Sequence, residues 1–141
     1  MDTGTRDELP SEAGASHFLE HLLFKGSETM TARDIAETFD SIGAESNAFT
    51  SKDYTCFWAR LLDQDLPTGL GVLAEMIQRP AFRQRDIDAE RSVVIEEINM
   101  NEDDPSDVAF EEFTQAVFAH HPLERPVLGT RESIRAMSRD D

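Results

Sequence analysis

The chain has 141 residues, of which 39% are hydrophobic and 30% charged, and its formal net charge is −16. This length allows one modest domain with a hydrophobic core, and the composition is ordinary for a globular protein. Because phosphate binding needs clustered Lys and Arg, the acidic balance argues against a nucleic-acid partner. It is compatible with the attraction of basic peptides, although a solvated acidic surface is the simpler explanation.

Targeting and disulfide signals are missing from the sequence. No run approaches the roughly 18 apolar residues that a membrane span needs, so no span is predicted. The first ten residues are polar and acidic, which indicates neither a secretory signal nor a basic transit segment. The single cysteine, Cys56, excludes an internal disulfide framework and is expected to be a buried small hydrophobe. We therefore expect a cytoplasmic protein.

Periodicity and breakers predict mainly helices, with one pair of strands. A polar lead-in over residues 1–14 precedes the first helix. The predicted helices cover residues 15–25, 31–42, 65–78, 84–100, 106–119 and 130–137. Two stretches with strand-forming composition, 44–51 and 54–62, flank a turn and predict a hairpin.

Several residues set the expected helix ends and core faces. Thr31 and Ser106 are predicted N-caps, and residues 101–105 are predicted to break the long helix. Apolar residues at helical spacing support two of the helices: Ile87, Val94 and Ile98 in the long one, and Phe110, Phe113 and Val117 in the next. Since two strands are too few for a complete layered fold, we expect an α+β domain whose sheet is incomplete.

The segment most informative about chemistry is His17-Phe18-Leu19-Glu20-His21. On a helix, His17 and His21 lie one turn apart on the same face, so both imidazoles can reach one metal ion. Two nitrogen ligands at this spacing suit Zn²⁺. Glu20 borders the same face, where it can serve as a general base toward a water molecule. The order is the reverse of the commoner motif, in which Glu follows the first His.

A catalytic zinc usually takes three protein ligands, so a third must come from elsewhere. His120 and His121 lie beside a proline in an expected loop, whereas the long helix offers Glu90, Glu96 and Glu97. Spacing alone does not choose among these glutamates. A His pair at this spacing also occurs by chance, as a surface feature without a ligand.

Four ordered segments resemble the pitrilysin/insulinase metallopeptidases, the inverzincins, and especially their processing-peptidase branch, which includes the mitochondrial processing peptidase β-subunit and bacterial relatives. The resemblance runs from about Gly4 to Arg135. Its segments are Gly14–Gly26, which contains the histidine motif, Asn47–Ser51, Glu90–Ile98 and Arg125–Thr130. Agreement at four ordered sites is highly specific.

The resemblance implies a role for each site residue. It implies Glu97 as the third Zn²⁺ ligand beside the two histidines, and Glu90 as a group that orients the site or supports proton transfer. It also implies that a peptide or unfolded polypeptide adds as a strand along Asn47, Ala48 and Phe49. Core packing is the alternative role of Phe49, and Phe24 and Trp58 are expected in the core.

The resemblance further implies that residues 1–141 form only part of an N-terminal peptidase domain, in which helices pack on a largely antiparallel sheet. Complete enzymes of this type enclose a chamber with a second homologous domain or subunit, so the activity of this chain alone is doubtful. The expected function is zinc-dependent endopeptidase activity on peptides or presequences, with Glu20 as base. The alternative is a non-catalytic scaffold subunit. A structural zinc module is disfavoured, because such sites usually need four ligands, often cysteines.

Overall fold

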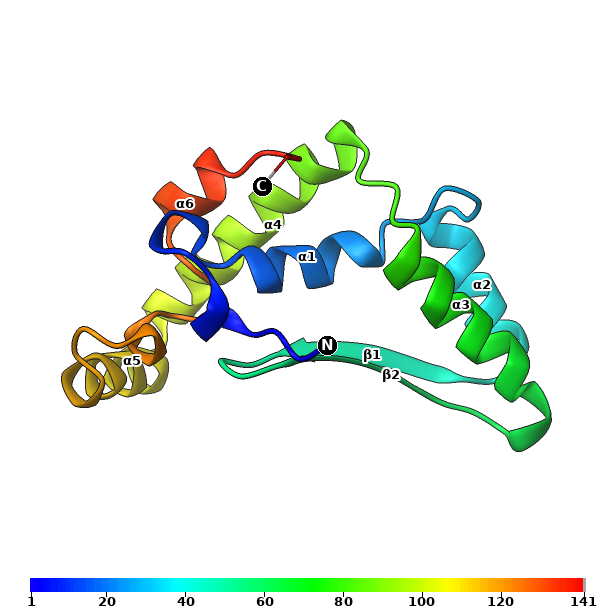
Figure 1. Cartoon of the computed structure of the whole chain (residues 1–141), viewed down its shortest axis with the longest axis horizontal. Coiled ribbons are helices and arrows are strands. Elements are labelled where there is room, and N and C mark those ends of the chain that lie inside the picture. Colours follow the sequence, from blue (N-terminus) through cyan, green and yellow to red (C-terminus); the bar gives the residue numbers. More distant parts are fainter. Residues whose placement is uncertain (141) are drawn as a thin grey trace.

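The structure is a computed structural model that describes residues 1–140, and it is built from helices around one antiparallel hairpin (Figure 1). The helices are α1 (Ala15–Leu23), α2 (Ala32–Ser41), α3 (Leu66–Gln78), α4 (Gln84–Asp103), α5 (Pro105–Val117) and α6 (Arg131–Ala136). The strands are β1 (Glu45–Thr50) and β2 (Thr55–Arg60). This is the predicted α+β class with a small antiparallel sheet.

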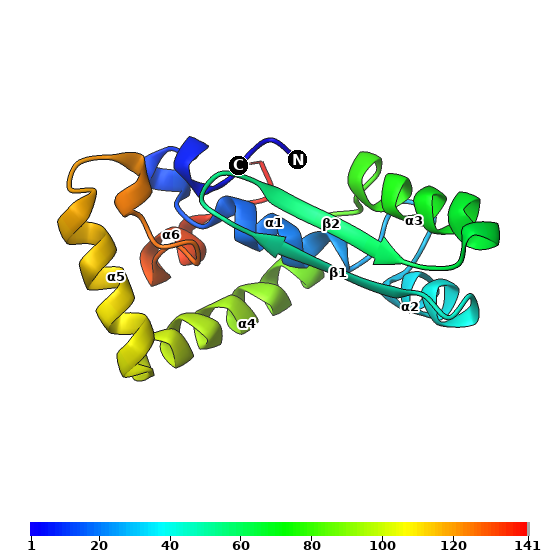
Figure 2. The same cartoon turned by 90° about the horizontal axis from the view of Figure 1, so that it is seen from below.

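Helix α1 is central in this arrangement. It lies along one face of the hairpin and beside α4, with which it makes extensive contact (Figures 1 and 2). Helices α2 and α3 lie at one end of the molecule, whereas α5 lies at the other, at an angle to α4 (Figure 2). Two elements distant in sequence, α1 and α4, are therefore held side by side.

The hairpin presents different residues on its two faces. Ala48 of β1 lies opposite Phe57 of β2, and the Phe57 ring is 6.0 Å from that of Phe24, at the end of α1. Because side chains alternate along a strand, Ala48 is buried on the α1 side while Asn47 and Phe49 are exposed on the other. The main chain of Met1 exchanges two hydrogen bonds with Thr55, so the predicted lead-in begins along the outer edge of β2.

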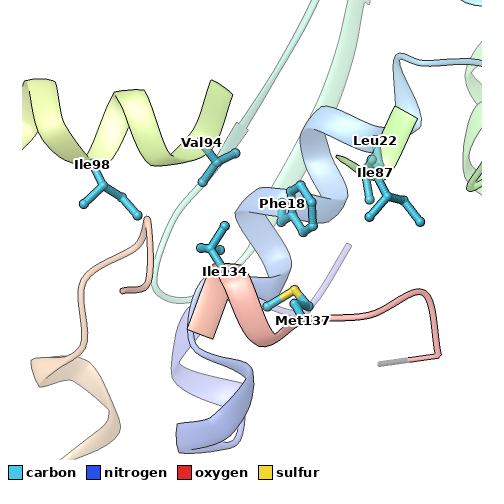
Figure 3. Close-up of a cluster of buried hydrophobic side chains, with 7 residues drawn as sticks. All are labelled: Phe18, Leu22, Ile87, Val94, Ile98, Ile134 and Met137. Carbon is cyan, nitrogen blue, oxygen red and sulfur yellow. The ribbon is translucent and has the colours of Figure 1, made fainter. Parts of the chain in front are cut away.

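The main hydrophobic core joins α1, α4 and α6 (Figure 3). It consists of Phe18, Leu22, Ile87, Val94, Ile98, Ile134 and Met137. The predicted apolar side of the long helix is thereby confirmed. A second cluster between α2 and α3 contains Ile35, Phe39, Val72 and Met76, with Phe24 packed against it. Phe24 is thus a core residue as predicted, whereas Trp58 and Cys56 are only half-buried.

Of the two predicted N-caps, one is correct and one is wrong. Thr31 caps α2 in a reciprocal box with Asp34, as predicted. The predicted break within 101–105 is confirmed but confined to Asp104, and the predicted Ser106 cap is wrong. Helix α4 continues to Asp103, and the Asp104 side chain accepts hydrogen bonds from the two N–H groups that follow Pro105. An aspartate before a proline at the first helical position is a strong alternative cap, and it restarts the helix at once.

Helix α5 has the predicted apolar stripe, but no described residue buries it. Phe110, Phe113 and Val117 remain 63%, 64% and 55% exposed. The helix also ends at Val117, two residues before the predicted end. None of the helices within residues 1–140 is long and apolar enough to cross a membrane.

Candidate metal centre

The start of α1 is fixed by contacts that leave one of its sides free for chemistry. Glu8 accepts hydrogen bonds from the backbone N–H groups of Gly14 (2.8 Å) and Ser16 (2.7 Å), which satisfies the first turn. Gly14 adopts φ 91°, and a Cβ there would lie 2.6 Å from the carbonyl oxygen of Leu128. Only glycine fits this position without strain. Burial raises the pKa of the Glu8 carboxyl.

The opposite side of α1 brings two imidazoles against a carboxylate of α4. The Nε2 atoms of His17 and His21 lie 3.3 Å apart. Glu97 Oε2 lies 3.4 Å from His21 Nε2 and 3.7 Å from His17 Nε2. Within residues 1–140, no other three side chains of His, Cys, Asp or Glu bring ligand atoms within 4.8 Å of one another. Glu97 was one of three glutamates that spacing left open.

These separations fit a tetrahedral zinc ion. Zn–N and Zn–O bonds of about 2.0–2.2 Å at tetrahedral angles place ligand atoms about 3.3–3.6 Å apart. The three observed separations span 3.3–3.7 Å. Three ligands from one His pair and one carboxylate leave the fourth position of a tetrahedron open, which is the arrangement of catalytic rather than structural zinc sites.

The protonation of His17 also suits a metal ligand. Burial, and secondarily the neighbouring His21, lower the pKa of His17 to about 4. The ring is therefore neutral at neutral pH, so one of its two nitrogens carries a lone pair that can bind a metal, and its contact with Glu97 is not an ion pair. Its Nδ1 is buried and has no hydrogen-bond partner within the described part of the chain.

A buried carboxylate orients the second imidazole. Glu90 is 6% exposed, and its Oε2 lies 3.2 Å from His21 Nδ1. Its other oxygen, Oε1, lies 2.7 Å from the ammonium of Lys25. A carboxylate that accepts from Nδ1–H leaves Nε2 free, and in this structure Nε2 faces His17 and Glu97.

The remaining predicted site residues fall in distinct places. Glu20 lies outside the three-ligand cluster, and its Oε2 accepts a hydrogen bond from the Thr50 hydroxyl at 2.5 Å. Glu96 is exposed. Asn47, Ala48 and Phe49 lie on β1, and the Asn47 Oδ1 accepts from the Ala48 N–H at 2.8 Å. The Phe49 ring is 43% exposed and packs on Tyr54, so it is not in the core.

Two residues that sequence reasoning missed contact the site, and the two other histidines stay outside it. Lys25 follows His21 by four residues, a spacing that could have indicated a neighbouring side chain. Thr50 carried no signal, because it lies 30 residues from Glu20. His121 caps a short 3-10 turn, and neither it nor His120 joins the cluster.

Comparison with known proteins decides the family. The family described as insulinase (peptidase family M16) matches residues 1–131. The chain belongs to this family. An uncharacterized zinc protease of Mycobacterium leprae is 48% identical over 139 residues, which cover 99% of this chain and 31% of that protein. The chain thus spans about a third of the length of the curated relatives it matches.

Solved structures of M16 peptidases share the fold. A protease from Helicobacter pylori superposes with a TM-score of 0.94 at 26% identity, over 99% of this chain and 34% of that one. A peptidase M16 inactive domain from Pseudomonas fluorescens superposes with a TM-score of 0.86 at 19% identity, over 99% of this chain and 34% of that one. The M16 fold therefore occurs in both proteases and inactive domains.

Proposed function

We propose that this chain carries the active site of a zinc-dependent metalloendopeptidase. The observation that supports it best is the tetrahedral spacing of the His17, His21 and Glu97 ligand atoms, which are 3.3–3.7 Å apart. Relatives that match nearly all of this chain are named zinc proteases, which supports the choice of metal. In this proposal the three residues bind one Zn²⁺.

The remaining site residues have complementary tasks. A bound Zn²⁺ would polarise the scissile carbonyl and lower the pKa of water, so that hydroxide would be available to attack at neutral pH. Glu20 takes the proton of the attacking water and returns it to the leaving amine. Glu90 and Lys25 hold His21 in the tautomer that presents Nε2 to the metal. Glu20 suits the role of base because it borders the histidine face without belonging to the ligand set.

The proposed substrate is a peptide or unfolded polypeptide that adds as a strand to β1. Among residues 1–140, strand β1 is paired on one side only, and Asn47 and Phe49 project from its exposed face. Main-chain hydrogen bonds along Ala48 and its neighbours would bind many sequences, presequences included. Because the chain spans about a third of its relatives, we also propose that a second homologous domain or subunit closes the chamber around this site.

A non-catalytic scaffold role is the second candidate, because an M16 inactive domain has the same fold. A scaffold subunit would not require the neutral His17 imidazole opposite Glu97, or the buried Glu90 carboxylate beside His21. The assembled geometry of His17, His21 and Glu97 therefore favours the enzyme. Absence of stoichiometric zinc from the purified full-length protein would favour the scaffold.

The substitution Glu20→Gln tests the proposal in the full-length protein. We expect it to retain one zinc per chain and to lower kcat on an unstructured peptide by about 10²–10⁴-fold, because an amide cannot accept the proton. Elemental analysis and a fluorogenic peptide assay measure the two quantities. Glu28→Gln, at an exposed glutamate, is the matched control. Wild-type cleavage by Glu20→Gln would refute the assigned base.

A further inference from the structure

We propose that Thr50 is a positioning residue that aims the Glu20 carboxylate, an inference that rests on the proposed peptidase function. The Thr50 hydroxyl donates to Glu20 Oε2 at 2.5 Å across 30 residues of sequence. Within residues 1–140, the structure gives the Glu20 side chain no other hydrogen-bond or ion-pair partner. The orientation of the proposed base thus depends on one hydroxyl at the end of β1.

Strand β1 holds this hydroxyl rigidly. Thr50 is the last residue of β1 and lies opposite Thr55, which is 1% exposed and donates its own hydroxyl to the carbonyl of Thr3 at 3.1 Å. A β-branched side chain on a paired strand has few χ1 rotamers. The Glu20 side chain has three χ angles and lies half-buried on α1. The stiff residue therefore orients the flexible one.

This contact can serve proton transfer directly. A general base acts only when one of its oxygens lies within hydrogen-bond reach of the proton it takes. With Oε2 engaged by Thr50, Glu20 keeps Oε1 free to face the reacting water. Small misplacement of a reacting group costs large factors in rate while substrate binding is unaffected. The expected signature is a loss in kcat without a change in KM.

The same strand also links the base to the proposed substrate edge. Thr50 immediately follows Phe49 and lies two residues from Ala48. Side chains at positions 48 and 50 share the α1 side of the sheet, because strand residues alternate. Strand β1 would therefore hold both the added peptide and the Glu20 carboxylate in position. This arrangement keeps the base in constant register with a backbone bound along the strand.

Hydroxyl removal in the full-length zinc-loaded protein tests the inference. Thr50→Val keeps the shape and the β-branch, and we expect kcat to fall about 10–100-fold with KM and zinc content unchanged. Thr50→Ser keeps the hydroxyl and is expected to restore kcat to within about threefold. Thr50→Ala removes the hydroxyl by a different change of shape, so it should reproduce the loss and guards against misfolding of the valine variant. Thr68→Val, at an exposed threonine on α3, is the control with wild-type kcat.

A double-mutant cycle separates positioning from a general structural effect. Glu20→Asp shortens the side chain and breaks the Thr50 contact, so Thr50→Val should cost several-fold less kcat in that background than in wild type. Equal costs in both backgrounds would overturn the inference. Wild-type kcat in Thr50→Val beside an inactive Glu20→Gln would also overturn it and leave the proposed function standing. Full activity of Glu20→Gln would instead refute Glu20 as the base, and absence of zinc-dependent cleavage by the wild-type protein would overturn the proposed function itself.

Discussion

The buried carboxylate behind His21 allows a sharp prediction, because its two oxygens serve two different donors. Glu90 Oε1 accepts from the Lys25 ammonium at 2.7 Å, and Oε2 faces His21 Nδ1 at 3.2 Å. In Glu90→Gln only one end of the side chain remains an acceptor. If the amide oxygen turns to Lys25, the NH₂ group faces His21 Nδ1 and favours the tautomer that carries its proton on Nε2. That tautomer cannot bind a metal through Nε2.

The expected size of the effect follows from this conflict. Loss of a carboxylate that orients a metal-bound imidazole typically lowers metal affinity about 10–100-fold, or about 1.4–2.7 kcal/mol. Because Lys25 competes for the single acceptor, we expect Glu90→Gln to fall near about 100-fold. Adding Lys25→Met removes the competing donor, so the amide oxygen can turn to His21. The double variant should therefore regain about tenfold in affinity.

Competition with a zinc-chelating indicator at constant neutral pH measures these affinities. Glu96→Gln, an exposed glutamate on the same helix, is the matched control and should bind zinc as wild type does. Wild-type zinc affinity in Glu90→Gln would refute the orienting role of this carboxylate. Equal affinities of Glu90→Gln and the double variant with Lys25→Met would refute the competition between the two donors.

Two further predictions concern stability. Since the pKa of His17 is about 4 in the folded protein and 6.5 as its ordinary value, the unfolded state takes up this proton first as the pH falls. As the pH falls between these values, the free energy of unfolding of the metal-free protein should decrease by up to about 1.4 kcal/mol per pH unit. Urea denaturation at a series of pH values measures this dependence, which should be shallower in His17→Gln. Equal dependence of the unfolding free energy on pH in the two proteins would contradict this. Gly129→Ala should destabilise by about 2–4 kcal/mol, because Gly129 has φ 72° and its Cβ would lie 2.2 Å from the carbonyl oxygen of Ala13. Gly71→Ala, on an exposed helix position with open space, should instead stabilise by about 0.5–1 kcal/mol; a similar loss of Tm in both variants would contradict the argument.

Local patterns predicted most of the secondary structure correctly. The six helices and the hairpin all lie where periodicity and breakers placed them, since these signals act within one or two turns. The errors lie at the junction of α4 and α5, where Asp104 and Ser106 are both good caps two residues apart. The exposed stripe of α5 shows a second limit. Helical spacing identifies an apolar face, but it does not identify what covers that face.

In the candidate site, too, local spacing predicted some residues and not others. The His17–His21 pair was readable from sequence, because four-residue spacing on a helix places two side chains on one face whatever the rest of the chain does. The family resemblance added the choice of Glu97. In hindsight Glu90 also carried a signal, since it falls on the buried stripe formed by Ile87 and Val94.

The sequence by itself determined the local parts of this protein: the helix with two imidazoles on one face, its glycine boundaries, and the apolar side of α4. Spacing left open which carboxylate meets those imidazoles; the family resemblance implied Glu97, and the tertiary structure brings it there. The tertiary structure alone decided which cation neutralises Glu90 and which hydroxyl holds Glu20. The physical reason is that helix geometry is set by neighbours three or four residues away, whereas these contacts join α1 to α4 and β1 across 30 to 80 residues. Such contacts depend on how the hydrophobic cores dock the elements, and no local spacing encodes that docking.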